Sequence, residues 1–108
     1  MQAVTILRDF LKSNPLPSEG QQIDRIMTDL ANKNVSAIKP SEFPEGADSL
    51  SVFFFSLLML NTDLHNSKIE VKMTPDQFVR NLAGQVNVPE KQLRFVYDDI
   101  KETPLVRV

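Results

Sequence analysis

The stretch that decides the fold is residues 48–62, which read DSLSVFFFSLLMLNT. Within it, the longest apolar run extends from Val52 to Leu60 and is interrupted only by Ser56. A helix that is apolar on nearly every side is buried at the centre of a globular core. The run lies inside the chain and is about half as long as the roughly 20 residues that a membrane-spanning helix needs. We therefore expect a core helix over residues 48–62, with Asp48 as its N-terminal cap.

Two helices are expected before this core helix. Residues 2–13 carry apolar side chains on one helical face, and two prolines then break the pattern. Ser18 and Gln21 have the S-x-x-Q spacing of a capping box, in which two side chains satisfy free backbone N–H groups. This spacing predicts a second helix over about residues 19–34, followed by a loop up to residue 47.

Two more helices are expected after the core helix. A polar turn over residues 61–71 leads to Thr74 and Gln77, which repeat the capping-box spacing with proline at the first helical position. The short helix that they start stops at Gly84. A further proline opens a last helix over about residues 89–103.

These elements add up to an all-α fold of about five helices in a single compact domain over residues 1–108. The net charge of −2 and the pI of about 5.3 argue against binding to nucleic acid, which usually selects a basic face. The sequence contains no cysteine, which excludes disulfides, a thiolate nucleophile and a zinc–thiolate site. We expect no bound metal.

Three local patterns have a second interpretation. His65 is the only histidine and has no sequence-local partner for a catalytic triad, so we expect it to make a structural hydrogen bond. Residues 61–67 alternate like the start of a calcium loop, but Asn66 and Lys72 stand where that loop needs glycine and glutamate. The last two helices resemble a helix-turn-helix, but the final one carries four acidic and three basic residues, a poor surface for phosphates.

Glu19 allows two interpretations. A glutamate at the start of a helix ordinarily stabilises it through the helix macrodipole, by about 0.3–1 kcal/mol. Here two prolines and a Ser-Glu-Gly turn stiffen the surrounding chain and present the carboxylate at a protruding corner. The second interpretation is therefore a functional carboxylate.

Two stretches resemble the signature motifs of Sec-7 domains, the catalytic modules of exchange factors for Arf-type small GTPases. Residues 16–27 read LPSEGQQIDRIM, where the family pattern is close to LPGEAQKIDRIM. Residues 59–66 read MLNTDLHN, as in the family, and are followed by KMT at residues 72–74 and QFVRN at residues 77–81. The resemblance covers about residues 4–105.

The chain departs from the family pattern at three positions and in length. Ser18 and Gly20 stand where the family prefers glycine and alanine, and Ser67 replaces the usual proline. A glycine inside a helix costs up to about 1 kcal/mol relative to alanine. A full Sec-7 domain is longer and begins with additional helices. The resemblance therefore implies a partial domain, namely its C-terminal, catalytic half.

The resemblance implies a guanine-nucleotide exchange factor for Arf-type GTPases. Glu19 matches the glutamate finger that, in the family, displaces magnesium and opposes the β-phosphate of GDP. The residues that match GTPase-binding positions are Asp24, Ile26, Met27, Phe55, Met59, Asn66 and Met73. Because exchange uses no covalent chemistry, we expect a regulatory catalyst and not an enzyme. We expect no cofactor either, because GDP and magnesium belong to the GTPase.

The resemblance also bears on inhibition and location. Positions that govern sensitivity to brefeldin A in the family fall at Phe55, Ser56, Asp63 and Met73. The last three match the sensitive type, whereas Phe55 stands where tyrosine is typical, which predicts partial sensitivity. We expect a cytoplasmic protein, peripheral at Golgi or endosomal membranes. Its membrane contact would be indirect, through the GTPase or through domains outside this chain.

Two alternatives stay open at this point. In the first, the chain is a non-catalytic helical module that binds a GTPase or serves as an adaptor. In the second, it is an incomplete fragment that does not fold stably alone. A half domain exposes apolar faces that the missing helices would cover.

Overall fold

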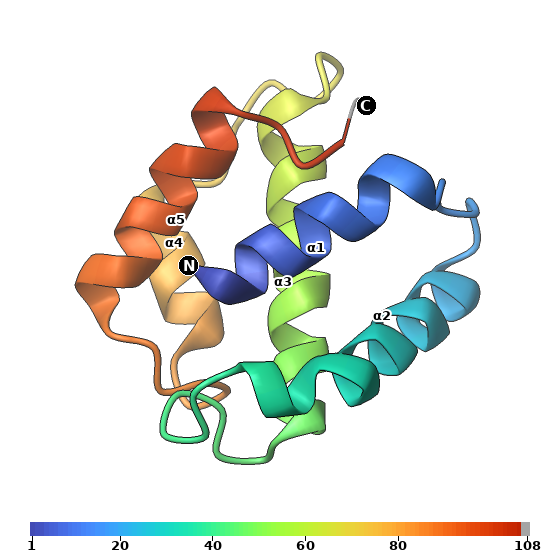
Figure 1. The fold of residues 1–108 in the computed structure, drawn as a ribbon. Coiled ribbons are helices and arrows are strands. Elements are labelled where there is room, and N and C mark those ends of the chain that lie inside the picture. The colour runs from blue at the N-terminus through green and yellow to red at the C-terminus, as the bar shows by residue number, and fades with distance from the viewer. Residues whose placement is uncertain (107–108) are drawn as a thin grey trace.

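The computed structural model describes residues 1–106, which form a bundle of five α-helices (Figure 1). The helices are α1 (Gln2–Ser13), α2 (Gly20–Asn34), α3 (Ala47–His65), α4 (Pro75–Leu82) and α5 (Glu90–Glu102), with a short 3-10 helix at Val35–Ala37. In the described residues the β-type pairing is limited to an isolated bridge between Ala83 and Val86. The predicted all-α class and the predicted number of helices are confirmed.

Helix α3 is the axis of the bundle, as its apolar sequence predicts. Helices α1, α2, α4 and α5 all contact it, and Figure 1 shows it upright behind α1, between α2 and the α4–α5 pair. Its fully buried apolar side chains are Leu50, Phe53, Phe54, Leu57 and Leu60. By length and composition α3 also qualifies as a membrane-spanning helix, but this is weak evidence because a core helix passes the same test.

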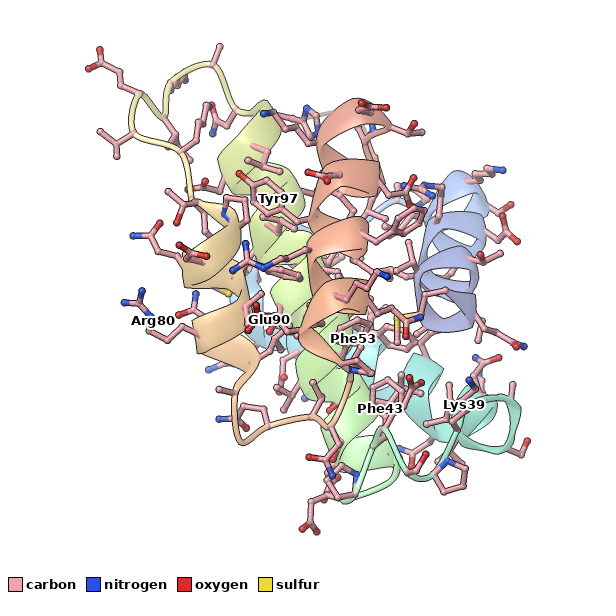
Figure 2. All side chains as sticks on the ribbon, turned by 90° about the vertical axis from the view of Figure 1, so that its left-hand side faces the viewer. Lys39, Phe43, Phe53, Arg80, Glu90 and Tyr97 are labelled. Atoms are coloured by element: carbon pink, nitrogen blue, oxygen red, sulfur yellow. The ribbon has the colours of Figure 1, made fainter. Side chains whose placement is uncertain are left out.

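Aromatic contacts join the loops and the outer helices to this core. Phe43, in the loop before α3, meets Phe53 edge-on at a ring-centroid distance of 5.6 Å, and Figure 2 shows the two side by side. Phe78 of α4 and Tyr97 of α5 have centroids 6.2 Å apart in a tilted arrangement. Such pairs contribute about 0.5–1.5 kcal/mol beyond the area that they bury.

The predicted capping box at Ser18 and Gln21 is wrong. Glu19 occupies the N-cap position with an extended backbone (φ −86°, ψ 128°), and α2 begins at Gly20 without a side-chain cap. Ser18 therefore lies one residue before the cap, and Gln21 is the second helical residue instead of the third. A capping box needs the serine at the cap and the glutamine at the third position.

Both ends of α3 also differ from the prediction. The N-cap is Gly46 and not Asp48, because Gly46 adopts a φ of 61° and lets the chain enter the helix earlier. Asp48 lies in the first turn, where its negative charge still interacts favourably with the helix dipole. At the other end α3 continues to His65, so residues 61–65 are helical and do not form a turn.

The second capping box, at Thr74 and Gln77, is confirmed. The Gln77 N–H donates to Thr74 Oγ1 (3.2 Å), the Thr74 N–H donates to Gln77 Oε1 (2.9 Å), and Pro75 is the first helical residue. Helix α4 ends at Leu82, shortly before Gly84. The φ of 80° at Gly84 requires glycine and turns the chain away from the helix axis.

Replacing Thr74 with alanine removes a formed cap, whereas replacing Ser18 removes none. We expect Thr74→Ala to lower the free energy of unfolding by about 1 kcal/mol and Ser18→Ala to lower it by less than about 0.5 kcal/mol. Urea unfolding followed by circular dichroism measures both. Equal losses in the two variants would show that the two helix starts are wrongly assigned.

Tyr97 offers a spectroscopic test of how α5 packs against the segment between α3 and α4. Its side chain is buried, and its hydroxyl donates to the Met73 carbonyl. Burial raises the pKa of Tyr97, and the negative charges of Asp63 and Asp98 raise it further. Because Tyr97 is the only tyrosine and the chain has no tryptophan, the absorbance of tyrosinate reports on this residue alone.

We expect Tyr97 in the folded chain to titrate above the value near 10 of the urea-unfolded chain. The raised pKa means that the neutral phenol contributes stability that is complete below about pH 10 and is lost as the pH rises through the folded pKa. Spectrophotometric titration with and without urea gives both midpoints. A folded midpoint at or below the unfolded one would contradict the contact.

Candidate functional site

A groove of about 450 Å³ lies along one side of α3, and we call it the apolar groove. Its walls come from α2 and the segment before it, from α3, from the segment between α3 and α4, and from the C-terminal segment. The lining residues are Leu16, Ile23, Phe55, Leu58, Met59, Asn61, Thr62, Asp63, Ile69, Met73 and Val106. Most of these side chains are apolar, so the groove suits an apolar partner surface.

Helix α3 leaves apolar side chains uncovered on this side. Met59 is 54% exposed and Val52 is 38% exposed, while Phe55 is half-buried between them. Residues at positions i, i+3 and i+7 lie on one face of a helix, so the three side chains form one stripe. Apolar side chains that gather beside a groove mark an interaction site.

Polar side chains at the end of α3 hold two walls of the groove. Asn61 is buried, and its amide oxygen accepts from the Leu105 N–H (2.8 Å) while its amide nitrogen donates to the Val106 carbonyl (3.1 Å). The Asp63 carboxylate accepts a hydrogen bond from the Met73 N–H. Through these bonds Val106 and Met73 are fixed where they line the groove.

The next two polar residues tie α3 to other segments. His65 Nε2 donates to the Ile100 carbonyl (2.6 Å), so its predicted structural hydrogen bond is confirmed. The Asn66 side chain accepts from the Lys68 N–H (2.9 Å), and the Asn66 carbonyl accepts from Lys72 Nζ (2.6 Å). Asn66 therefore shapes the segment after α3 and does not itself line the groove.

The segment of residues 14–19 joins α1 to α2 and forms a corner at the right edge of Figure 1. Glu19 is the last residue of this segment. Its side chain is exposed, and none of the hydrogen bonds or ion pairs within residues 1–106 involves its carboxylate. Leu16 and Ile23, just before and after it in sequence, both line the apolar groove. The corner therefore adjoins the groove and presents an uncompensated negative charge beside it.

The predicted GTPase-binding residues of α2 and those of α3 lie in different places in the structure. On α3 and the segment after it, Phe55, Met59 and Met73 line the groove. On α2, Ile26 is half-buried and lines a smaller hollow of about 250 Å³ between α1 and α2. Asp24 is exposed on the same helix.

Met27 differs from its prediction as an accessible wall residue. Its side chain is 0% exposed, because it shares the inner face of α2 with Leu30 and Ala31 and packs into the core. It is therefore not open to a partner in this structure.

Several groove residues were missed by sequence reasoning. Leu16 and Ile23 lie inside the first motif, so their proximity to Glu19 was an available signal. Val106 had no local signal, because the hydrogen bond from Asn61 joins residues 45 positions apart. Ile69, in the segment between α3 and α4, also lines the groove. Its position there depends on how that segment folds, which the sequence did not indicate.

The four positions associated with brefeldin A sensitivity lie close together. Phe55, Asp63 and Met73 line the apolar groove. Ser56 lines an adjoining hollow of about 270 Å³, together with Met59 and Met73. The two hollows therefore share Met59 and Met73.

Comparison with known proteins gives consistent matches. The family model described as "Sec7 domain" matches residues 1–105. The "ADP-ribosylation factor guanine nucleotide-exchange factor sec72" of Schizosaccharomyces pombe is 39% identical over 103 residues, which are 93% of this chain and 6% of that protein. The corresponding factor SEC7 of Saccharomyces cerevisiae is 42% identical over 103 residues, which are 93% of this chain and 5% of that protein.

Solved structures agree with these matches. The "Crystal structure of Sec7p catalytic domain" superposes with a TM-score of 0.82 at 39% identity, over 95% of this chain and 56% of that one. The "Structure of ARF1-GDP bound to Sec7 domain complexed with Brefeldin A" gives a TM-score of 0.85 at 35% identity, over 97% and 54%. The chain thus spans about half the length of these solved chains and a small part of the curated relatives.

The names of the relatives correct one expectation. They are guanine nucleotide-exchange factors, and catalysis of nucleotide exchange is classed as an enzymatic activity. The prediction that the function lies outside the enzymes is therefore wrong, because the absence of covalent chemistry does not exclude enzymatic catalysis.

The family model, the relatives and the solved structures each match more than nine-tenths of this chain. From residue 1 to residue 105, this chain belongs to the Sec-7 domain family.

Proposed function

We propose that this chain is the part of an exchange factor that releases GDP from an Arf-type small GTPase, with Glu19 as the group that enters the nucleotide site. The observation that carries this proposal is the Glu19 corner, an exposed carboxylate on a stiff segment beside an apolar groove. Further support comes from relatives named as exchange factors and from the solved complex of a Sec-7 domain with ARF1-GDP.

The carboxylate would act by displacing magnesium and by facing the β-phosphate of GDP. Two like unit charges 4 Å apart repel by about 4 kcal/mol at an effective dielectric constant near 20. That energy corresponds to a loss of roughly a thousandfold in nucleotide affinity. Loss of magnesium adds to the effect, because the metal no longer neutralises the phosphates.

The apolar groove would supply the binding energy. Coupling between two ligands is reciprocal, so a chain that weakens GDP binding must bind the nucleotide-free GTPase more tightly than the loaded form. Phe55, Met59 and Met73 are the proposed apolar contacts, with Asp24 and Asn66 as polar contacts outside the groove. Met27 is left out of this set because it is buried, and Ile26 is left out because it lines the separate hollow between α1 and α2.

The same proposal covers cofactor, location and inhibitor. The chain would use no cofactor of its own, because GDP and magnesium are part of the GTPase. It would work in the cytoplasm at Golgi or endosomal membranes, reaching the membrane through the GTPase or through further domains, and it would not bind nucleic acid. The cluster of sensitivity positions around the groove supports partial inhibition by brefeldin A.

The competing function is a module that binds a GTPase without driving exchange. The observation in its favour is that the groove walls do not include Glu19. In that case the groove would bind the GTPase without releasing its nucleotide. A change at Glu19 distinguishes the two functions, because it should affect exchange and not binding in the groove.

Reversing the charge of Glu19 should abolish exchange and keep the fold. We expect Glu19→Lys to lower kcat/KM for GDP release from an Arf-type GTPase by up to about a thousandfold. Asp29→Lys is the matched control, because Asp29 is another exposed carboxylate on α2, and it should keep activity near that of the wild type. Fluorescent-GDP release measures both. Equal release by Glu19→Lys and the control would favour the non-catalytic module.

A charge in the groove should weaken binding of the GTPase. We expect Met59→Lys to raise KM for the GTPase at least about tenfold, since losing a hot-spot contact costs about 2 kcal/mol or more and about 1.4 kcal/mol is already tenfold. Phe95→Lys on α5 is the control, because Phe95 is 68% exposed but lies outside the groove. An equal effect of the two variants on KM would place the binding surface elsewhere.

A further inference from the structure

The C-terminal segment Thr103–Val106, which we call the strap, runs from the end of α5 to the apolar groove. Leu105 is buried at 4% exposure, and Val106 is one of the groove-lining residues. Figure 1 shows the strap passing from α5 across the upper part of α3. The strap therefore joins the last helix to one wall of the groove.

Two side chains hold the strap. At its start, Arg8 of α1 donates through Nη2 to the Thr103 carbonyl (2.8 Å) and through Nη1 to the Asp99 carboxylate (3.2 Å). At its end, Asn61 exchanges two hydrogen bonds with Leu105 and Val106. The Arg8 Nε is buried without a hydrogen-bond partner in the described residues, so this clamp is incompletely satisfied.

Thr103 has the features of a phosphorylation site. Its side chain is exposed, its backbone is extended (φ −126°, ψ 99°), and an exposed proline, Pro104, follows it directly. Kinases that recognise threonine before proline need an exposed hydroxyl on an extended chain. The other Thr-Pro pair, at Thr74, is less suitable because its hydroxyl is engaged in the capping box and its proline begins α4.

We propose that Thr103 is the phosphoacceptor of a proline-directed protein kinase, and that the phosphate releases the strap from the groove. In the transfer, Thr103 Oγ1 forms a bond to the terminal phosphorus of ATP while the bond from that phosphorus to the bridging oxygen breaks. ADP leaves, and the hydroxyl proton passes to solvent through the base of the kinase. The inference concerns the strap alone and does not depend on nucleotide exchange.

A phosphate at Thr103 would be repelled electrostatically by its surroundings. It adds about −1.5 to −2 charges at pH 7. Thr103 caps the C-terminus of α5, where the helix dipole disfavours negative charge, and Asp99 and Glu102 lie within the preceding turn. The phosphate also draws the guanidinium of Arg8 away from the Thr103 carbonyl and from Asp99, so the Arg8 contact moves from the backbone of the strap to the Thr103 side chain. The backbone of the strap then loses its first clamp, and only the hydrogen bonds of Asn61 still hold that backbone.

The test is phosphorylation of the purified chain by a proline-directed kinase and ATP, with the site located by mass spectrometry. We expect one phosphate, which is retained in Thr74→Val and lost in Thr103→Val. Hydrogen exchange of the Leu105 amide should then be about tenfold faster in the phosphorylated chain, while the amides of α3 around Leu57 keep their protection. Thr103→Val treated with kinase is the control for exchange.

Three outcomes would overturn the proposal. They are phosphate at Thr74 alone or at no residue of the folded chain, unchanged exchange at Leu105 once Thr103 carries phosphate, and a loss of protection that extends equally to Leu57. The last result would mean general unfolding and not release of the strap.

Discussion

The constraint on which the structure depends is the apolar character of α3. Nearly every side of this helix has to be removed from water, and fully burying one large apolar side chain contributes about 1.5–3 kcal/mol. Helices α1, α2, α4 and α5 meet this demand by packing around it. Between α2 and the segment that follows α3 the cover is incomplete, and Met59 stays exposed there. The apolar groove is thus the place where the fold leaves part of α3 uncovered.

The polar end of α3 has a structural role, which the sequence analysis predicted for His65. Asn61, Asp63 and His65 each bond to a different segment: the C-terminal strap, the approach to α4, and α5. One short stretch of helix therefore sets the positions of two groove walls and one outer helix. An amino-acid change there would act on the site through the shape of its walls, even where the changed side chain touches no partner.

Features set by local physics could be predicted from the sequence, and those set by distant contacts could not. The periodicity of apolar residues gave the five helices, and the spacing at Thr74 gave a real capping box. The same spacing at Ser18 failed, because the helix starts one residue later than the box requires. The first motif pointed to the Glu19 corner, but Val106 could not be placed in the groove, since its position there depends on a hydrogen bond across 45 residues. Met27 showed a similar limit, because a match to a family motif does not tell whether an apolar side chain lines the groove or packs in the core.

The central claim is that the Glu19 corner reaches the nucleotide site of a GTPase while the groove holds the partner. Since the chain has no cysteine, Ser18→Cys offers a unique attachment point for a photoreactive cross-linker beside Glu19, and Lys33→Cys offers one at the far end of α2. Cross-linked peptides of a nucleotide-free Arf-type GTPase can then be mapped by mass spectrometry. The account predicts cross-links from position 18 to the phosphate-binding loop, suppressed by excess GDP with magnesium, and none from position 33. Cross-links from position 18 to a remote surface, unaffected by GDP, would contradict it.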